Sequence, residues 1–345
     1  MKPPRIYPPR RVLVVQLRRL GDVVLTTALL EDLRREFPDA TVDFLVGDHA
    51  SPLLEHHPLI HERLIYARDQ AVRAWRAVRA RRYDWIVDPQ SSPRTAPLAL
   101  MSGARVRAGF AVRGWGWVYT HRLPRSGRPT EYVARERQRL LEMLGVRIGR
   151  TRTSLVLTAE ERAAGRRLLD RHGVVSRRPK VGLVISTADV TREWPLDHFA
   201  ALSAALSREG FETVVFEMPG DGAKIARIRE TAPSIIQIPV PAIRDFMAAL
   251  AASDVLVSAD TGPAHIATAL GTPRVTIYGP QLPAMWTPPD DPSIIALRAE
   301  SARTLGLVPK HDPRAATLAA EVSPARVLDA VRTLLARTSH VRNEA

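Results

Sequence analysis

Short runs of hydrophobic residues alternate along the chain with longer segments in which hydrophobic residues recur every three or four positions. Residues 12–17 form such a run, with Gln16 as its polar member, as is typical of a strand buried on both faces of a parallel sheet. The segment that follows, 22–36, has helical hydrophobic spacing. In the same half, the pattern predicts further strands at 41–46 and 84–88 and further helices at 69–82 and 131–144.

The second half of the chain repeats this order of elements. Strands are predicted at 181–185, 213–216, 235–238, 255–257 and 274–278, and helices at 197–208, 222–231, 242–252, 263–270 and 323–337. Strands that alternate with helices are typical of doubly wound α/β domains. At 345 residues the chain also exceeds the size at which one hydrophobic core keeps growing. We therefore expect two Rossmann-like domains in tandem.

The segment between the two halves, residues 151–179, is polar and rich in arginine. It contains a predicted helix, 159–172, and ends at the break Ser176-Arg-Arg-Pro179, near which we place the linker. The expected domains are 1–175 and 176–322, followed by a C-terminal helix and tail at 323–345. Two such domains predict a ligand in the cleft between them, beyond the carboxyl ends of both sheets.

Composition narrows the class of protein. Hydrophobic residues make up 45% of the chain, and no run approaches the roughly 20 residues that span a bilayer. The basic N-terminus leads into only a short hydrophobic strand, so we do not expect a signal peptide. Because the chain has no cysteine, disulfides, thiolate zinc sites and a cysteine nucleophile are excluded. These features favour a cytoplasmic protein.

The formal net charge is +14, and most of it lies in the first half, where residues 1–150 contain 27 Lys and Arg against 15 Asp and Glu. This surplus indicates an anionic partner, which nucleic acid, an anionic membrane surface or an anionic glycolipid would each satisfy. An aromatic content of 6% argues against a surface on which bases stack. A dinucleotide-dependent oxidoreductase is disfavoured because no strand is followed by G-x-G-x-x-G.

The turn Asp260-Thr261-Gly262-Pro263 joins a predicted strand to an alanine-rich helix. Pro263 suits the first helical turn and Asp260 or Thr261 can cap the free amides, so a capped helix explains the turn by itself. The alternative is an anion site, because a helix N-terminus offers N–H groups and a positive dipole end, and glycine lets a phosphate approach the backbone. His265 would project near the same place, or else only pack there.

Leu20-Gly21-Asp22 presents the same choice after the first strand. Gly21 can adopt a positive φ and Asp22 can cap the helix that follows. Alternatively, Asp22 faces the cleft from the end of the first strand, where a carboxylate is suited to act as a general base. The spacing alone leaves both interpretations open.

Three segments carry a resemblance to a known family: QLRRLGDVVLTTALLEDLRREFPDATVDFLV (16–46), REWPLDHFAALSAAL (192–206) and SADTGPAHIATALGTPRVTIYGPQLPAMWTP (258–288). Together they resemble the ADP-heptose:lipopolysaccharide heptosyltransferases, which are glycosyltransferases of the GT-B fold, and the likeness runs from about residue 11 to about residue 337. The resemblance implies inverting, metal-independent transfer of a heptose or related sugar from an ADP-sugar to a hydroxyl of a glycolipid or glycan, as in lipopolysaccharide core synthesis.

The resemblance also implies roles for individual residues. By matched position, Asp22 is the base that takes the proton of the acceptor. Arg192 stands where the family usually has a lysine that neutralises the diphosphate of the donor, and arginine keeps that charge and adds a bidentate fork. Glu217 matches the acid that holds the nucleoside ribose. The donor-binding block is matched by Asp260, Thr261, Gly262 and His265.

Ser186-Thr187-Ala188-Asp189 replaces the His-Pro-Gly-like turn of many family members, which leaves the identity of the donor open. The expected acceptor loops, 48–70 and 89–128, contain arginines that would meet phosphates or acidic sugars, or else form a solvated basic surface. These arginines are Arg63, Arg68, Arg94, Arg105, Arg107 and Arg113.

The sequence contains no H-E-x-x-H pattern, and the paired His56-His57 have no acid at ligand spacing except Glu55. We therefore expect no metal and no cofactor besides the donor substrate. The expected partners are a nucleotide-sugar and an anionic glycolipid or glycan, without nucleic acid. We expect a monomer in the cytoplasm, associated peripherally with the inner face of the plasma membrane. The alternatives are a nucleotide-sugar epimerase on the same scaffold and a basic nucleic-acid-binding protein.

Overall fold

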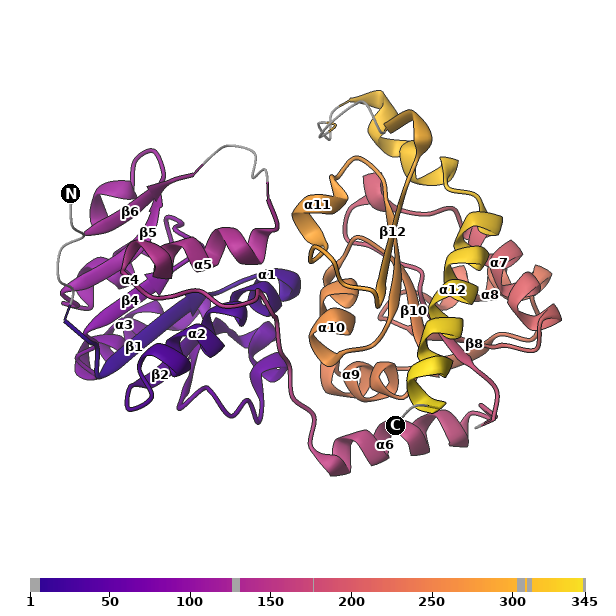
Figure 1. Ribbon diagram of the computed structural model, residues 1–345, viewed down its shortest axis with the longest axis horizontal. Coiled ribbons are helices and arrows are strands. Elements are labelled where there is room, and N and C mark those ends of the chain that lie inside the picture. The colour runs from indigo at the N-terminus through magenta and orange to yellow at the C-terminus, as the bar shows by residue number, and fades with distance from the viewer. Residues whose placement is uncertain (1–6, 126–130, 176, 303–307, 309–311, 344–345) are drawn as a thin grey trace. The chain divides into compact units, whose positions relative to one another are not determined.

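The computed structural model describes residues 7–125, 131–175, 177–302, 308 and 312–343. Its contacts divide the chain into two compact units, Met1–Val156 and Leu157–Ala345. Each unit is built around a parallel sheet of six strands (Figure 1). The expected α/β class with two Rossmann-like domains is confirmed.

Unit 1 has the strand order β3-β2-β1-β4-β5-β6. The strands are β1 (Arg11–Gln16), β2 (Thr41–Gly47), β3 (Arg63–Tyr66), β4 (Trp85–Asp88), β5 (Val106–Ala111) and β6 (His121–Pro124). The helices are α1 (Leu20–Thr26), α2 (Ala28–Glu36), α3 (Ala71–Ala80), α4 (Ala96–Met101) and α5 (Val133–Met143), with short 3-10 helices η1 (Asp48–Leu54), η2 (Arg68–Gln70) and η3 (Gly116–Val118).

The core of unit 1 follows from the run of hydrophobic residues in β1. Successive side chains of a strand point to opposite faces, so Leu13 and Val15 lie on one face while Val12 and Val14 lie on the other, and all four are buried. The face of Leu13 and Val15 packs against α3, α4 and η3 in one hydrophobic cluster. Helices α1, α2 and α5 contact one another as a separate group.

Unit 2 has the order β12-β11-β10-β7-β8-β9, which is the order of unit 1 read in the opposite direction. The strands are β7 (Lys180–Val184), β8 (Glu212–Glu217), β9 (Ile236–Pro239), β10 (Val255–Ala259), β11 (Arg274–Tyr278) and β12 (Ile294–Arg298). The helices are α6 (Ala159–Arg171), α7 (Leu196–Arg208), α8 (Gly222–Thr231), α9 (Ile243–Ala251), α10 (Gly262–Leu270), α11 (Pro283–Trp286) and α12 (Pro324–Asn343), with η4 (Val190–Arg192), η5 (Glu300–Ala302), η6 (Pro313–Ala316) and η7 (Leu318–Glu321).

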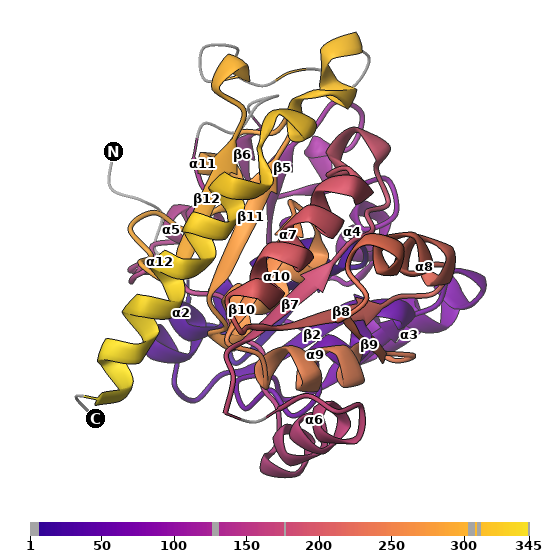
Figure 2. The ribbon, with the colours of Figure 1, turned by 90° about the vertical axis from the view of Figure 1, so that its right-hand side faces the viewer.

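Helices α7 and α12 lie side by side on one face of the second sheet (Figure 2). Phe199 and Leu206 of α7 share a hydrophobic cluster with Val327 and Val331 of α12, and all four are buried. The C-terminal helix is therefore part of the core of unit 2 and not an appendage to it.

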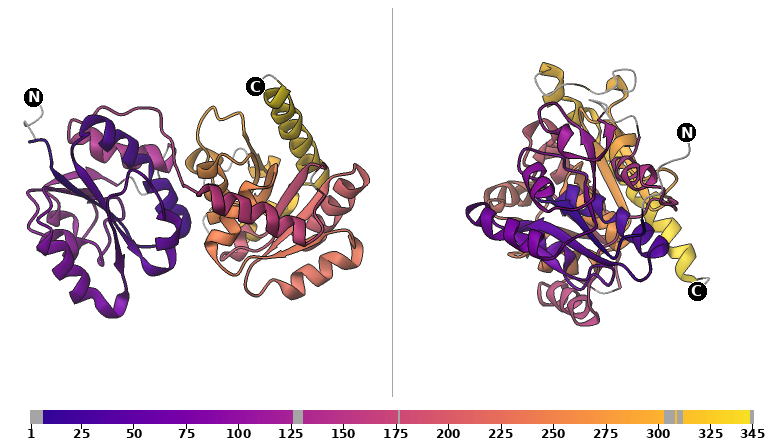
Figure 3. Two further views of the ribbon diagram at one scale, coloured as in Figure 1. Left: turned by 90° about the horizontal axis from the view of Figure 1, so that it is seen from below. Right: turned by 90° about the vertical axis from the view of Figure 1, so that its left-hand side faces the viewer.

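The division between the units falls earlier than the expected boundary at 175 and 176. Helix α6 lies across unit 2 (Figure 3), and it packs against α9 closely enough that a Cβ on Gly165 would meet the backbone of Ala248. Arg244 of α9 also forms an ion pair with Glu161 of α6. These contacts place α6 with the second sheet. The expected linker residue Ser176 lies outside the described residues.

Several sequence expectations about local structure are wrong. The predicted helix 22–36 is divided into α1 and α2 at Thr27, whose hydroxyl donates to the carbonyl of Val24 at 2.6 Å. The segments 48–70 and 89–128, expected to be loops, contain η1, η2, β3, α4, β5, η3 and β6. The periodicity also missed β12. Most of these elements are short, and β3, β6 and β12 lie at sheet edges. An edge strand pairs with a neighbour on one side only, so it needs fewer hydrophobic residues than a central strand and gives a weaker sequence pattern.

Candidate active site

Asp22 lies in the first turn of α1, just after the carboxyl end of β1. The chain turns at Arg19, whose φ is +59°, and α1 begins at Leu20 without a side-chain cap. The alternative in which Gly21 takes a positive φ and Asp22 caps the helix is therefore wrong. The carboxylate of Asp22 remains partly exposed, at 27%, so a substrate can reach it.

Arg137 of α5 holds Asp22 in place. Its Nη2 atom lies 2.6 Å from Oδ1 of Asp22, and its Nη1 atom donates to the backbone carbonyl of Asp22 and, at 2.7 Å, to Oγ1 of Thr26. The guanidinium is buried, so its position is fixed by α5. Among the described residues, Oδ2 of Asp22 has no hydrogen-bond donor. One carboxylate oxygen is thus anchored while the other stays available.

Sequence reasoning missed Arg137, although a signal was present. The buried stripe of α5 consists of Val133, Ala134, Arg137, Gln138, Leu140 and Leu141. An arginine and a glutamine therefore occupy positions where the helical period predicts hydrophobic residues. Since buried polar groups require partners, these two positions pointed to polar contacts inside unit 1. Gln138 contacts Asp32 in the same way, with 2.5 Å between Nε2 and Oδ2.

Arg192 and Asp260 meet at the carboxyl ends of β7 and β10, which are neighbours in the second sheet. Nη1 of Arg192 donates to the backbone carbonyl of Asp260 at 2.8 Å and lies 3.3 Å from its Oδ2. Asp260 is 1% exposed, and burial raises its pKa to about 6 against the opposing effect of Arg192 and Arg274. The side chain of Arg192 remains 18% exposed. A cation is therefore available at this corner.

Thr261 is the N-cap residue of α10, but neither its side chain nor that of Asp260 caps the helix, so the interpretation in which these side chains cap the free amides is wrong. The Asp260 side chain is turned to Arg192, and the Thr261 hydroxyl donates backwards to the carbonyl of Ala259 at 3.3 Å. Neither of these two side chains accepts a hydrogen bond from the first turn of α10, which begins at Gly262. N–H groups and the positive end of the helix dipole are left for an anion there.

His265 is buried in α10, with its ring 5.9 Å from that of Trp286 between centroids. This contact fits the packing interpretation of His265. Glu217 ends β8, the neighbour of β7, and accepts a hydrogen bond from Gln237 at 2.8 Å. Glu217, Arg192 and Asp260 therefore follow three adjacent strands at the same edge of one sheet.

The loop 186–189 is tied to the end of β8 through Asp221, another residue that sequence reasoning missed. Ser186 donates its hydroxyl to Oδ1 of Asp221, and the backbone N–H of Met218 donates to Oδ2 at 3.1 Å. Asp189 caps η4 by accepting from the N–H of Thr191 at 3.3 Å. The loop that replaces the His-Pro-Gly-like turn is thereby held beside Glu217 and Arg192.

Arg274 is a second buried cation that sequence reasoning missed. It is fully buried at the start of β11, and its Nε donates to Oγ1 of Thr268 at 2.7 Å while Nη1 contacts Thr276. Its Nη2 has no partner among the described atoms, and the same holds for Oγ of Ser258 and Oδ1 of Asp260. The sequence of β11, Arg-Val-Thr-Ile-Tyr, alternates polar and hydrophobic residues. Since alternate side chains of a strand share a face, this alternation could have predicted that Arg274 and Thr276 lie together on a polar face.

The expected acceptor arginines do not share one environment. Nη1 of Arg63 donates to the carbonyl of Ser51 at 3.0 Å and lies 3.3 Å from a carboxylate oxygen of Glu55, so its charge is used inside the unit. Arg68, Arg94 and Arg113 are exposed and form no ion pair within the described chain. Of the other two, Arg105 is exposed, whereas Arg107 donates to the carbonyls of Val118 and Ala104 at 2.8 and 2.7 Å.

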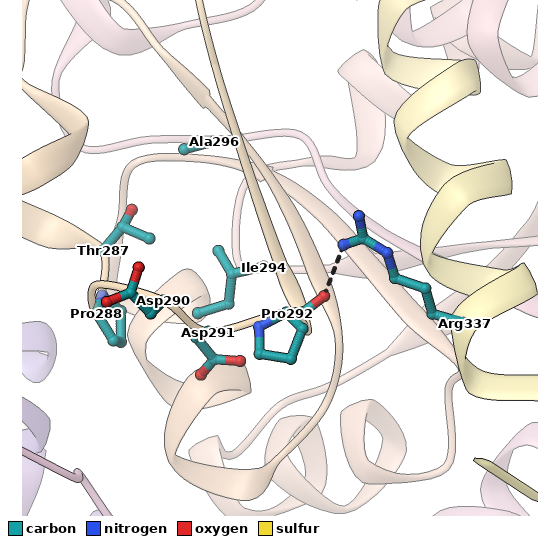
Figure 4. A pocket seen from close by; sticks show the side chains of 8 residues that line it. All are labelled: Thr287, Pro288, Asp290, Asp291, Pro292, Ile294, Ala296 and Arg337. Carbon is teal, nitrogen blue, oxygen red and sulfur yellow. Dashed lines mark hydrogen bonds between the residues drawn. The ribbon is translucent and has the colours of Figure 1, made fainter. Parts of the chain in front are cut away.

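A hollow of about 430 Å³ lies elsewhere in unit 2, beside the edge strand β12 (Figure 4). Arg337 reaches into it and donates to the carbonyl of Pro292 at 2.9 Å. None of the predicted site residues lines this hollow. In the part of the chain that the structure describes, no group of three or more His, Asp and Glu could hold a metal ion, and no helix is long and hydrophobic enough to cross a bilayer.

The sequence matches the family described as glycosyltransferase family 9 (heptosyltransferase) over residues 71–305. Lipopolysaccharide heptosyltransferase 3 of Escherichia coli is 26% identical over 79% of this chain and 84% of its own.

Two solved structures are similar throughout. A family 9 glycosyltransferase from Veillonella parvula has a TM-score of 0.83 at 24% identity, covering 95% of this chain and 97% of its own. The ADP-heptose lipopolysaccharide heptosyltransferase II of Escherichia coli has a TM-score of 0.77 at 21% identity, covering 95% and 99%. The chain shares the GT-B fold with them, and it is a glycosyltransferase that belongs to family 9, the heptosyltransferases.

Proposed function

We propose that this enzyme transfers a heptose, or a closely related sugar, from an ADP-sugar to a hydroxyl of a lipopolysaccharide-type glycolipid, with inversion at the anomeric carbon. Unit 2 supplies the donor site and unit 1 supplies the base. The observation that carries the proposal is the corner of Arg192, Asp260 and the uncapped start of α10. A guanidinium and free amide groups at one place suit a diphosphate.

Different residues near this corner bind different parts of the donor. Arg192 and the amides at Thr261 and Gly262 bind the diphosphate, and Glu217 accepts from the ribose hydroxyls. Asp260 lies on the side toward the sugar and holds Arg192 through its buried carboxylate. His265 supports the wall of the site through its packing on Trp286. When ADP leaves, the negative charge that develops on its terminal phosphate is stabilised by Arg192 and the dipole of α10, so the transfer requires no metal.

Asp22 activates the acceptor. Its free Oδ2 takes the proton of the acceptor hydroxyl while that oxygen forms a bond to the anomeric carbon. The bond between this carbon and the phosphate oxygen breaks, and the electron pair leaves with ADP. Attack opposite the leaving group inverts the anomeric centre. Arg68, Arg94 and Arg113 are exposed cations suited to the phosphates or acidic sugars of the acceptor.

We further propose that the enzyme is a monomer, works in the cytoplasm and meets its acceptor at the inner face of the plasma membrane. The positive surplus of residues 1–150 supports an anionic acceptor on a membrane.

The test is a transfer assay on the purified protein with ADP-heptose, other nucleotide-sugars and a lipopolysaccharide core glycolipid as acceptor, in the presence and absence of EDTA. We expect ADP-heptose to give ADP and a glycosylated product in equal amounts, with or without EDTA. The anomeric signals in the NMR spectrum should show that the configuration at the anomeric carbon of the product is opposite to that of the donor. Turnover of the donor without any acceptor would instead assign a nucleotide-sugar epimerase.

A further inference from the structure

We propose that one face of unit 1 docks on an anionic lipid bilayer. This face, called here the α3–α4–η3 face, carries five exposed hydrophobic side chains: Val72, Leu100, Met101, Trp115 and Trp117. The inference rests on the proposed function in one respect, that the acceptor is a membrane lipid. The inference goes beyond that function because it identifies the surface of the enzyme that meets the membrane and the side chains that enter the bilayer.

The elements of this face form one continuous surface. Helix α3 contacts α4, and α4 contacts η3. Nε1 of Trp75 in α3 lies 3.4 Å from the backbone carbonyl of Met101, which joins the end of α4 to α3. All three elements cover the same face of the first sheet, because their buried residues Val78, Leu98 and Val118 share one hydrophobic cluster. The exposed side chains of these elements therefore belong to the outer side of a single layer.

The hydrophobic exposure is concentrated on this layer. Nine large hydrophobic side chains are exposed in the described part of the molecule, and five of them lie on the α3–α4–η3 face. Trp117 is 64% exposed and Val72 is 59% exposed. Clustered exposure of this kind marks a surface that is covered by a partner.

The orientation of Trp117 suits a membrane interface. Its indole N–H donates to the carbonyl of Gly114 at 3.1 Å. The polar atom is therefore satisfied within the loop, and the ring can enter an apolar layer without burying a free donor. Tryptophan is the residue type that is enriched at the boundary between lipid and water.

The charge around the hydrophobic side chains is one-sided. Residues 71–125 contain eleven arginines but only two acids, Asp84 and Asp88. Asp84 accepts from the backbone N–H groups of Arg10 and Arg11 at 2.8 and 3.0 Å. Asp88 is fully buried and accepts from Tyr119 at 2.6 Å. Neither acid neutralises the surface.

The exposed arginines keep their charge for a partner. Those on or beside the α3–α4–η3 face that form no ion pair with a described acid are Arg73, Arg76, Arg79, Arg94, Arg105 and Arg113. Basic side chains around exposed hydrophobic ones are the pattern of proteins that bind an anionic bilayer surface. Because arginine stays protonated at all relevant pH values, we expect this binding to depend on salt and lipid charge and not on pH.

Two other partners, a second copy of the chain and nucleic acid, fit this face less well than a bilayer. A second copy of the chain would bring two arginine-rich faces together, and like charges across an interface are unfavourable. Nucleic acid would satisfy the arginines but leave Val72, Leu100 and Met101 without an apolar partner. A bilayer with anionic headgroups satisfies both features at once.

The experiment is flotation of the full chain with vesicles of phosphatidylcholine alone or mixed with phosphatidylglycerol, at low and high salt. We expect binding to the anionic vesicles, loss of that binding in high salt, and little binding to phosphatidylcholine alone. The double variants Met101→Ser/Trp117→Ser and Arg73→Gln/Arg76→Gln should each weaken binding to anionic vesicles by about tenfold or more. The matched controls, Val175→Ser and Arg166→Gln/Arg167→Gln, change exposed side chains of unit 2 and should bind like the wild type.

Three results would overturn the inference. The first is no binding to anionic vesicles, and the second is an equal loss of binding in the unit 2 controls. The third is that Met101→Ser/Trp117→Ser abolishes self-association or single-stranded nucleic-acid binding of the wild type and leaves vesicle binding unchanged. Turnover of a water-soluble, delipidated acceptor separates this inference from the proposed function. Met101→Ser/Trp117→Ser should keep that turnover, which also shows that it folds. A wild type that binds vesicles but transfers no sugar would reject the proposed function and leave the docking surface standing.

Discussion

The Nη2 atom of Arg137 lies 2.6 Å from Oδ1 of Asp22, and the same guanidinium also contacts the backbone carbonyl of Asp22 and the hydroxyl of Thr26. Arg137 belongs to α5 and Asp22 to α1. A residue far along the chain therefore fixes the carboxylate to which we assign proton transfer. It does so through one oxygen and leaves the other available.

Arg137→Lys tests whether this contact positions the base. Lysine keeps the charge but cannot form the forked contacts, so Asp22 should lose its fixed orientation. We expect kcat to fall by about tenfold to a hundredfold while the KM for the donor stays close to that of the wild type. Steady-state kinetics at varied donor concentration measure both quantities.

A double-mutant cycle with Asp22→Asn provides the control. If Arg137 acts through Asp22, adding Arg137→Lys to Asp22→Asn should cost little further activity. Equal losses of kcat in both backgrounds would mean that Arg137 supports unit 1 in general. Arg135→Lys is the matched control for Arg137→Lys, because Arg135 lies on the same helix but pairs with Glu142 and not with Asp22. Its kcat should stay close to that of the wild type.

Arg192 should govern the affinity for the diphosphate. Arg192→Ala removes the cation beside α10, and we expect the Kd for ADP to rise by about tenfold to a hundredfold because a charge-assisted contact is lost. Arg192→Lys should retain most of the affinity, since lysine supplies the same charge. Calorimetric titration with ADP and with adenosine distinguishes a diphosphate contact from a general loss of binding. An unchanged Kd for ADP in Arg192→Ala would remove Arg192 from the donor site.

Asp260 should make the enzyme less stable as pH rises. Its pKa is about 6 in the folded protein against an ordinary value of 3.8, so between these values the folded state holds a proton that the unfolded state has released. The free energy of unfolding therefore decreases as the pH rises from about 4 to about 6, by roughly 3 kcal/mol from this group. Urea unfolding of wild type and Asp260→Asn across this range isolates the contribution, because Asn does not titrate.

Asp290→Asn is the matched control for this comparison, since Asp290 is an exposed acid of the same unit. Its pH profile of stability should parallel that of the wild type. Arg274→Met should raise the pKa of Asp260 further, because Arg274 lowers it. If Asp260→Asn has the same pH profile as the wild type, Asp260 does not titrate in this range.

The fold was largely predictable because buried parallel strands such as β1 and β7 are hydrophobic along most of their length. The order of strands within each sheet was not, and neither were β3 and β12, which are short strands at sheet edges. An edge strand is paired on one side only, so a few residues of mixed polarity suffice. Domain boundaries were also hard to place, because α6 precedes β7 in the chain but is recognised as part of unit 2 only through its packing on α9.

The candidate site was predictable where it follows a local motif. Asp22, Arg192 and Asp260 each lie in a short segment that carries the family resemblance. Arg137 and Asp221 lie outside those segments and reach the site through tertiary contacts. Arg274 lies within the third segment, but its effect on Asp260 follows from the folded structure and not from a local motif. The capping of α10 was mispredicted for the same reason, since the contact between Asp260 and Arg192 draws the carboxylate away from the helix. A local pattern cannot reveal a competing partner that is distant in sequence.

The most direct test of the account is heptose transfer by Asp22→Asn, measured together with the Kd for ADP-heptose in the same preparation. Asparagine preserves the size of the side chain but cannot take the proton. We expect the transfer rate to fall by about a hundredfold or more. The Kd should stay within about twofold of the wild-type value, because the proposed donor site lies in unit 2 and Asp22 in unit 1. A transfer rate equal to that of the wild type would contradict the assignment of Asp22 as the base.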